Sequence, residues 1–289
     1  AYRRQRQMCI RDRALAACGS SQSSNADKTY SYIFVSNPDT LDYITSTRDS
    51  TSSITTNLID GLLENDQYGN LIPSMAESWT VSKDGLTYTY KIRQGAKWYT
   101  SEGEEYADVT AHDFVTGLKY AADKKAENLY LVQDSIKGLA DYVEGKSSDF
   151  ETVGVKAVDD YTLQYTLIQP ETYWNSKTTA SILSPVNEAF LKSKGDDFGS
   201  VTPSSILSNG PYLFKSFTSK SLIEFDKNPN YWDKDNVKIE KVKLSFFDGS
   251  DQDSLARGFL EGNYTDGRIF PTSSVFAELK KGNEDKITY

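Results

Sequence analysis

The clearest alternation of hydrophobic and polar residues lies in residues 76–115. Every second residue from 88 to 92 is a tyrosine or isoleucine, with threonine and lysine between them. This two-residue period is typical of a half-buried β-strand. Asp84 and Gly85 stand just before the run, where an Asp-Gly pair favours a tight hairpin turn. We therefore predict a two-stranded hairpin here, followed by another strand around Trp98.

A helix start follows this hairpin. Thr110 precedes Asp113 by three residues, and in a capping box each of the two side chains bonds the other residue's backbone N–H. Phe114, Leu118 and Ala122 then recur at four-residue spacing, so they share one face of a helix. The sequence predicts a helix that begins at residue 111 and turns this apolar face to the core.

The remaining patterns complete a mixed α/β layout. Residues 48–57 are polar and predict a loop that leads into a helix with apolar residues 58, 59, 62 and 63. Ser184 and Pro185 predict the N-cap and first turn of a helix ending at Gly195. Further strands are expected at 30–35, 153–157, 161–167, 213–217, 222–225, 242–246 and 286–289, and further helices at 119–142 (with a turn near 138), 251–261 and 274–281.

Composition narrows the class of protein. The chain has 289 residues, long enough for about two domains, and 38% of them are hydrophobic. Its net charge of -9 argues against nucleic-acid binding and against attachment to anionic lipid through a basic face. The 19 tyrosines suit both strands and surfaces that bind variable ligands.

The candidate chemistry does not indicate an enzyme. The one histidine, His112, falls in the first turn of a capped helix, where we expect it to be exposed to solvent. One histidine and two N-terminal cysteines cannot form a zinc site, and no glycine-rich phosphate loop or calcium loop occurs. Carboxylate pairs such as Asp159-Asp160 lie in turns. We therefore predict no catalytic residue, no metal and no cofactor.

The N-terminal segment looks like the anchor of a lipoprotein. Residues 14–18 place small residues before Cys18, as in a lipobox whose cysteine becomes lipidated. Residues 20–27 then form a polar spacer. Residues 1–13 carry five arginines and no apolar run, so we interpret them as non-native or as a remnant. Residues 1–28 are thus expected to be signal remnant, lipobox and tether.

Two sets of motifs resemble the extracytoplasmic solute-binding proteins of family 5, the peptide/nickel class. The first set runs from A-E-S-W at residues 76–79 through D-G-x-T-Y-T at 84–89 and K-W at 97–98 to T-A-H-D-F-V at 110–115. The second is N-G-P-Y at 209–212 and K-N-P-N-Y-W-D at 227–233. We interpret the residues of the first set as scaffold and not as ligand contacts.

The resemblance implies the fold and the domain layout. It indicates a lobe like that of a type II periplasmic binding protein, with an inserted smaller α/β domain and a second lobe missing. The main lobe would be residues 29–70 and 195–248, the inserted domain 71–194, and the start of a truncated second lobe 249–289. Since family members are about twice as long, we interpret the chain as an N-terminal fragment.

The resemblance also implies function. It indicates an oligopeptide-binding receptor that delivers peptides to the permease subunits of a bacterial ABC importer, held outside the cytoplasm, at the cell surface or in the periplasm, by a lipid on Cys18. The residues expected to contact peptide lie in the polar loop after the first strand, in the small domain and in the N-G-P-Y loop: Asp49, Ser50, Thr51, Ser52, Ser53, Tyr130, Asn209, Gly210 and Tyr212.

Two alternatives stay open on the sequence. The same fold could bind another solute, such as a sugar, an opine or a metal chelate. A surface hydrolase is a further alternative, although no carboxylate pair stands out as its catalytic group.

Overall fold

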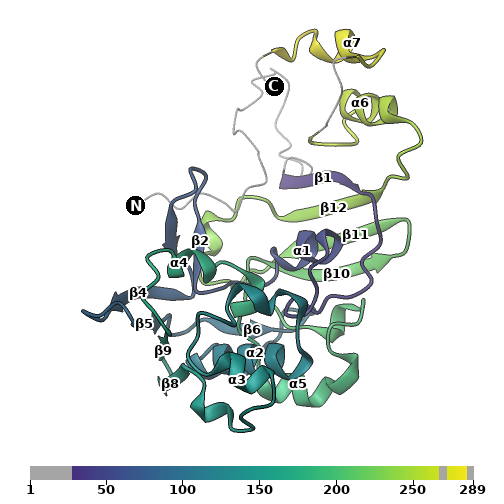
Figure 1. The fold of residues 1–289 in the computed structure, drawn as a ribbon. Coiled ribbons are helices and arrows are strands. Elements are labelled where there is room, and N and C mark those ends of the chain that lie inside the picture. Colours follow the sequence, from purple (N-terminus) through teal and green to yellow (C-terminus); the bar gives the residue numbers. More distant parts are fainter. Residues whose placement is uncertain (1–27, 267–271, 285–289) are drawn as a thin grey trace.

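The computed structural model of the chain describes residues 28–266 and 272–284 (Figure 1). A four-stranded sheet, here called the main sheet, has the order β1-β12-β11-β10. β1 is parallel to β12, and the other neighbours are antiparallel. Segments far apart in the sequence therefore share this mixed sheet: β1 (Thr29–Phe34), β10 (Tyr212–Thr218), β11 (Leu222–Lys227) and β12 (Lys241–Phe246).

Along β11 and β12 of the main sheet, buried apolar side chains alternate with partly exposed charged ones. Phe225 faces Val242 across β11 and β12, and each is 1% exposed. Lys243 and Glu224 face each other on the opposite side, where their charged groups lie 3.6 Å apart and are partly exposed. One face of the sheet thus joins the core while the other meets solvent. The predicted strands are confirmed to within two residues at 30–35, 213–217, 222–225 and 242–246.

A second antiparallel sheet has the order β4-β5-β9-β8. Tyr88, Tyr90 and Ile92 of β5 are 5%, 0% and 2% exposed, so the predicted buried face of the hairpin is confirmed. The strand predicted at 153–157 begins two residues later. The four strands are β4 (Ala76–Val81), β5 (Thr87–Ile92), β8 (Val155–Asp159) and β9 (Thr162–Thr166).

Helix α2 (Ala111–Lys124) packs against β8 and β9 of the second sheet. The prediction of a long helix over 119–142 is wrong beyond Lys124, because Lys125 adopts a left-handed conformation (φ 51°) that ends the helix. A 3-10 turn (Glu127–Leu131) and the short α3 (Leu139–Val143) follow. The turn expected near Gly138 is present, with φ 72° at that residue.

Two short hairpins form separate two-stranded sheets. β2 (Leu63–Asn65) pairs with β3 (Leu71–Pro73), and β6 (Lys97–Tyr99) pairs with β7 (Glu105–Asp108). The strand predicted around Trp98 is therefore confirmed as β6. Tyr99 also forms a β-bridge with Ser208, which connects this hairpin to the segment just before the main sheet.

The prediction of a loop at 48–57 followed by a helix is wrong: the helix lies in the first segment, and the second segment is not helical. α1 (Asp49–Thr55) is helical, whereas residues 58–62 are not. Thr51, Ile54 and Thr55 form its buried side, a helical spacing that the many serines and threonines concealed. The Leu58 and Ile59 N–H groups still donate to the Thr55 carbonyl at the end of α1, and the Leu58 carbonyl accepts hydrogen bonds from residues 209 and 210. Tertiary contacts therefore take over from helical ones at this point.

The helix predicted to start at Ser184 and Pro185 begins later. α5 (Glu188–Lys194) has Asn187 as its N-cap, and the side chain of Asn187 accepts the Phe190 N–H at 3.0 Å. Residues 184–186 instead lie against α2, where a Cβ on Gly117 would come within 2.2 Å of the Ser184 carbonyl. The predicted end at Gly195 is confirmed.

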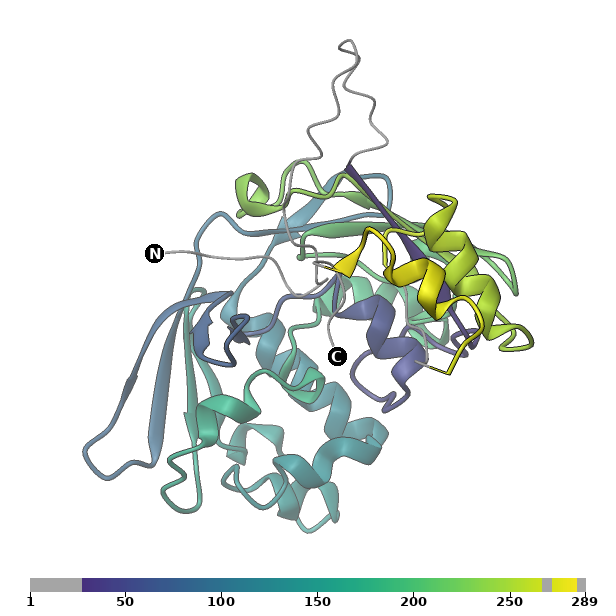
Figure 2. The same ribbon diagram turned by 90° about the horizontal axis from the view of Figure 1, so that it is seen from above.

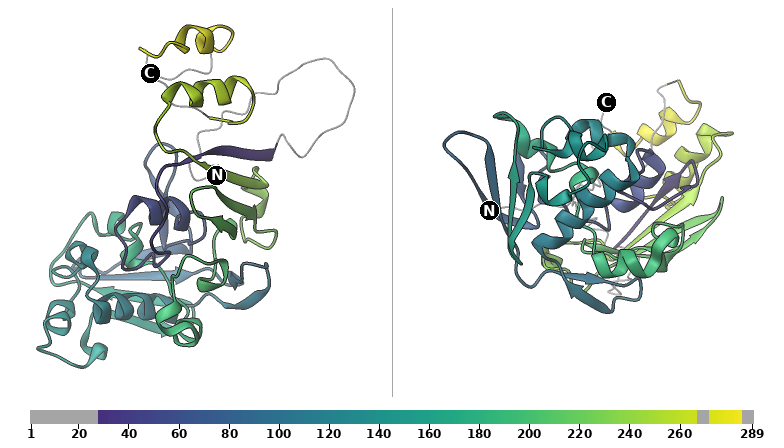
Figure 3. Two further views of the ribbon diagram at one scale, coloured as in Figure 1. Left: turned by 90° about the vertical axis from the view of Figure 1, so that its right-hand side faces the viewer. Right: turned by 60° about the horizontal axis from the view of Figure 1, so that its bottom comes forward.

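The last described elements stand apart from the rest of the chain. α6 (Gln252–Leu260) and α7 (Phe276–Lys280) confirm the predicted helices and lie beyond β1, on the side away from the second sheet (Figure 3, left). Viewed from above, they and the β4–β5 hairpin lie at opposite sides of the molecule (Figure 2). α4 (Trp174–Lys177) completes the set of α-helices. The strand predicted at 286–289 lies outside the described residues.

Candidate ligand-binding surface

α1 carries all five predicted ligand residues at 49–53, and it presents them unequally. Asp49, Ser52 and Ser53 are exposed, Ser50 is half-buried, and Thr51 is buried. The Ser52 hydroxyl donates to the Asp49 carbonyl at 3.2 Å, and the Ser53 hydroxyl donates to the Ser50 carbonyl at 3.3 Å. With their protons used inside the helix, these hydroxyls present oxygen lone pairs to solvent and can accept N–H groups.

Thr51 anchors α1 instead of facing solvent. Its side chain is 1% exposed, and its hydroxyl donates to the Thr40 carbonyl at 2.8 Å and accepts from the Ser46 hydroxyl at 3.0 Å. Asp42, two residues beyond Thr40, accepts from the Tyr120 hydroxyl of α2 at 2.8 Å. The loop before α1 is therefore fixed to the helical layer.

Tyr130 lies in the 3-10 turn after α2 and is 75% exposed. Thr47, just before α1, donates its hydroxyl to the Glu127 carboxylate in the same turn at 3.1 Å. This hydrogen bond places the turn that carries Tyr130 beside the start of α1. The structure thus brings the 49–53 segment and the turn of Tyr130 to one surface.

Asn209, Gly210 and Tyr212 lie at the other end of α1 and are all buried. The Asn209 side chain accepts the Asp60 N–H at 2.8 Å and donates to the Asp60 carbonyl at 3.1 Å. The Gly210 N–H donates to the Leu58 carbonyl at 2.8 Å. The N-G-P-Y loop at 209–212 therefore holds residues 58–60 in place by hydrogen bonds to their backbone.

Close approach explains the glycine in this motif. A Cβ at Gly210 would lie 2.7 Å from both the carbonyl carbon and the oxygen of Leu58. Tyr212 is 6% exposed, and its hydroxyl donates to the Ile239 carbonyl at 3.2 Å. Burial raises the pKa of the Tyr212 hydroxyl, so this group stays protonated and acts as a donor.

Asp60 is a buried centre that the sequence reasoning missed. Its carboxylate accepts the Tyr231 hydroxyl at 2.7 Å and the Trp232 indole N–H at 3.3 Å. The Arg93 guanidinium lies 3.7 Å from the centre of the Trp232 ring, which joins the end of β5 to the same cluster. The only signal for Asp60 in the sequence is its place as an acidic residue inside an otherwise apolar run at 58–63.

Asp113 of the capping box at the start of α2 also binds the indole of Trp98. Asp113 accepts the Thr110 N–H at 2.9 Å and the buried Trp98 indole N–H at 3.0 Å. Burial raises the pKa of the Asp113 carboxyl to about 6, against the opposing effect of these hydrogen bonds and of His112. Both motif residues are buried, as a scaffold role requires.

His112 and the acidic side chains are the candidate groups for catalysis or metal binding. His112 is exposed as predicted, and its Nε2 lies 3.3 Å from an exposed Asp160 carboxylate oxygen. Among residues 28–266 and 272–284, no group of three or more His, Cys, Asp or Glu side chains is placed to hold a metal ion. None of the helices in the described part of the chain has the length and apolar character to cross a membrane.

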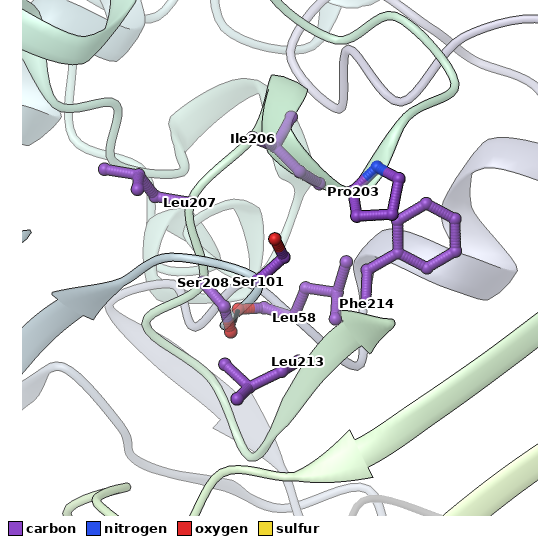
Figure 4. Close-up of a pocket in the computed structure, with 8 residues that line it drawn as sticks. All are labelled: Leu58, Ser101, Pro203, Ile206, Leu207, Ser208, Leu213 and Phe214. Atoms are coloured by element: carbon purple, nitrogen blue, oxygen red, sulfur yellow. Dashed lines mark hydrogen bonds between the residues drawn. The ribbon is translucent and has the colours of Figure 1, made fainter. Parts of the chain in front are cut away.

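A small cavity next to the segment before the main sheet is shown in Figure 4. Its volume is about 10 Å³, close to the minimum for one water molecule. This cavity is therefore too small to hold a peptide. Its lining residues are Leu58, Ser101, Pro203, Ile206, Leu207, Ser208, Leu213 and Phe214.

The described residues thus form a mixed α/β lobe built on two four-stranded sheets. The family model of the bacterial extracellular solute-binding proteins, family 5 Middle, matches residues 70–289. The chain belongs to this family.

Relatives of known name support the assignment. The chain is 64% identical over 275 residues to the oligopeptide-binding protein AliB of Streptococcus pneumoniae, covering 95% of this chain and 42% of AliB. It is 62% identical over 283 residues to the oligopeptide-binding protein SarA of Streptococcus gordonii, covering 95% and 43%. The chain therefore spans less than half the length of these relatives.

Solved structures share the fold. The substrate-binding domain of an oligopeptide ABC transporter from Bacillus anthracis matches with a TM-score of 0.79 and 29% identity, over 89% of this chain and 48% of that one. OppA of Listeria monocytogenes bound to peptide matches with a TM-score of 0.78 and 29% identity, over 89% and 49%. The predicted mixed α/β fold of the periplasmic-binding-protein kind is confirmed.

Proposed function

We propose that the protein is an extracytoplasmic oligopeptide-binding receptor that passes peptides to the permease subunits of an ABC importer. One observation carries this proposal: proteins named for oligopeptide binding are 59–64% identical to this chain over 95% of its length. The matching structures include one solved with a bound peptide. A receptor of this kind binds and releases its ligand, so we also propose that the protein is not an enzyme.

The exposed side of α1 suits recognition of a peptide main chain. Asp49, Ser52 and Ser53 offer oxygen acceptors, and main-chain N–H groups are donors common to every peptide. An extended peptide that is held through its main chain leaves its side chains free to vary. Tyr130 adds an exposed aromatic ring, which can pack against side chains of different chemistry.

Asn209, Gly210 and Tyr212 fit this proposal as supports of the surface. Their side chains and backbone hold residues 57–60 at the C-terminal end of α1. We propose that they act on the ligand through the position of α1, because burial keeps their side chains away from solvent.

The domain layout remains part of the proposal. The main sheet takes its strands from residues 29–70 and 195–248, and the second sheet takes its strands from 71–194, which supports a main lobe with an inserted domain. The β2–β3 hairpin spans the proposed boundary at residue 70. Residues 249–289 would begin the second lobe.

The lipid anchor is a further element of the proposal. Cys18 lies outside the described residues, and its support is the lipobox-like sequence before it. Lipidation at this cysteine would hold the receptor at the outer face of the membrane. Replacing Cys18 with serine in the expressing bacterium should move the protein from the membrane fraction to the soluble fraction.

Calorimetric titration tests the proposed ligand class. A protein extended to the length of its relatives should bind mixed peptides of several lengths. It should not bind the sugars, opines or metal chelates that the alternative reading allows. Binding of one of those solutes in place of peptides would replace the proposal, and turnover of a bound peptide would favour the hydrolase alternative.

A further inference from the structure

α6 and α7 form a unit with its own small buried cluster. Leu255, Ala256 and Leu279 are 3%, 2% and 8% exposed, yet they are not part of the large hydrophobic cluster of the chain. The hydroxyls of Ser273 and Ser274 donate to the Asp253 carboxylate and tie the start of α7 to α6. The two helices therefore pack on each other more than on the main core.

The chain enters this unit through a short exposed turn. Asp248 accepts the Ser250 N–H at 2.9 Å in this turn. Gly249 has φ 81°, and no atom lies within 4 Å of where its Cβ would be. A glycine in open space with this backbone conformation offers little resistance to rotation. The turn alone therefore does not set the orientation of α6 and α7.

A second contact lies at the edge of the main sheet. β1 is an edge strand, and such strands carry unpaired N–H and C=O groups. Thr265 satisfies both groups of Ser31: its hydroxyl accepts the Ser31 N–H at 3.0 Å, and its N–H donates to the Ser31 carbonyl at 2.8 Å. The same hydroxyl also lies 3.1 Å from that carbonyl.

Aromatic packing extends this contact back to α6. The ring of Tyr264 meets the ring of Tyr32 edge-on, with centroids 6.4 Å apart. Gly258 of α6 makes room for the other side of Tyr264, since a Cβ there would lie 2.5 Å from the ring. Tyr264 and Thr265 thus connect α6 to two neighbouring residues of β1.

We infer that Thr265 is a positioning residue: by binding both free backbone groups of Ser31, it sets the angle between the main sheet and the chain from α6 onwards. The turn at 248–251 is the flexible connection. The Ser31–Thr265 contact fixes the orientation of α6 and α7 relative to the main sheet. Neither residue is among the proposed peptide contacts, so this inference stands or falls independently of the proposed function.

Distance measurements between two spin labels test this inference. Labels are placed on exposed positions by Thr218→Cys on the main sheet and Glu278→Cys on α7, after Cys9 and Cys18 are changed to serine. Thr265→Val keeps the branched shape and removes the hydroxyl, while Thr265→Ser keeps the hydroxyl. We expect a broader or shifted distance distribution in Thr265→Val and an unchanged one in Thr265→Ser.

Hydrogen exchange of the Ser31 amide gives a second readout. It should accelerate in Thr265→Val, which lacks the acceptor, and stay protected in Thr265→Ser. Equal distance distributions in all three proteins would overturn the inference, and so would equal broadening in both variants, because the shape of the side chain would then matter and the hydroxyl would not. Thermal unfolding of each variant checks that the main core is intact.

Discussion

The Tyr231 hydroxyl donates a 2.7 Å hydrogen bond to the buried carboxylate of Asp60, joining residues 171 positions apart. Asp60 is 0% exposed and lies just beyond α1, while Tyr231 belongs to the motif that follows the main sheet's β11. Asn209 binds the backbone of the same Asp60. Both halves of the second motif set therefore meet at the segment that supports the candidate binding surface.

Tyr231→Phe should destabilise the chain without changing its shape. The variant removes one donor from a buried carboxylate, and the loss of a hydrogen bond to a buried charged group costs about 1–3 kcal/mol. Chemical denaturation followed by fluorescence measures the change in the free energy of unfolding. Tyr68→Phe is the matched control, because Tyr68 is 78% exposed and its change should have almost no effect. An equal loss in both variants would contradict the role given to Tyr231.

Gly210→Ala should be destabilising because of backbone crowding. The added Cβ would meet the carbonyl of Leu58 at 2.7 Å, and forced backbone shifts of this kind cost about 1–3 kcal/mol. Gly61→Ala, nearby, is the control: its Cβ would lie 3.4 Å from the Thr178 carbonyl oxygen, an ordinary contact. We expect unfolding at lower denaturant concentration for the first variant alone. Similar midpoints for both would show that residues 209–212 move away easily.

Asp113 should make stability fall as the pH rises through weakly acidic values. Burial raises the pKa of this carboxyl from 3.8 to about 6 in the folded protein, while the unfolded chain titrates near the ordinary value. The folded state therefore binds the proton more tightly. The resulting stabilisation is present below pH 4 and is lost as the pH passes 6. A shift of two pKa units corresponds to about 3 kcal/mol.

Asp113→Asn isolates this effect, because asparagine does not titrate and has nearly the same shape. The free energy of unfolding is measured for both proteins between pH 4 and pH 7. The stability of the parent relative to the variant should decrease across this interval. A constant difference, or one that grows in favour of the parent, would show that Asp113 titrates near or below its ordinary pKa.

Local patterns were the ones that the sequence predicted well. The alternation at 88–92 and the capping box of Thr110 and Asp113 depend on neighbours within a few residues, and both are present. The predicted helix start at Ser184 failed because the next residues lie against Gly117 of α2, which is far away in the sequence. α1 was missed because serine and threonine are weak helix formers in isolation, and because the burial of Thr51 against Thr40 depends on a tertiary contact.

The candidate site shows the same difference between local patterns and tertiary contacts. The family resemblance named Asp49, Ser52 and Ser53 as peptide contacts, and these side chains are exposed on α1, where they remain a prediction. The resemblance also named Asn209 as a peptide contact, but its side-chain amide makes hydrogen bonds to the backbone of Asp60. Asp60 showed only its place in an otherwise apolar run, because its side-chain partners lie 171 and 172 residues away.

Under the proposed function, the exposed side of α1 binds the main chain of peptides. The most direct test is the affinity of a Ser52→Leu/Ser53→Leu variant, in the protein extended to the length of its relatives, for two peptides of unrelated sequence. Ser193→Leu is the matched control, since Ser193 is an exposed helical serine of α5 whose hydroxyl donates to a carbonyl three residues earlier. We predict that the double variant weakens binding of both peptides to a similar extent while the control does not. Unchanged affinity, or a loss for one peptide alone, would contradict main-chain recognition by α1.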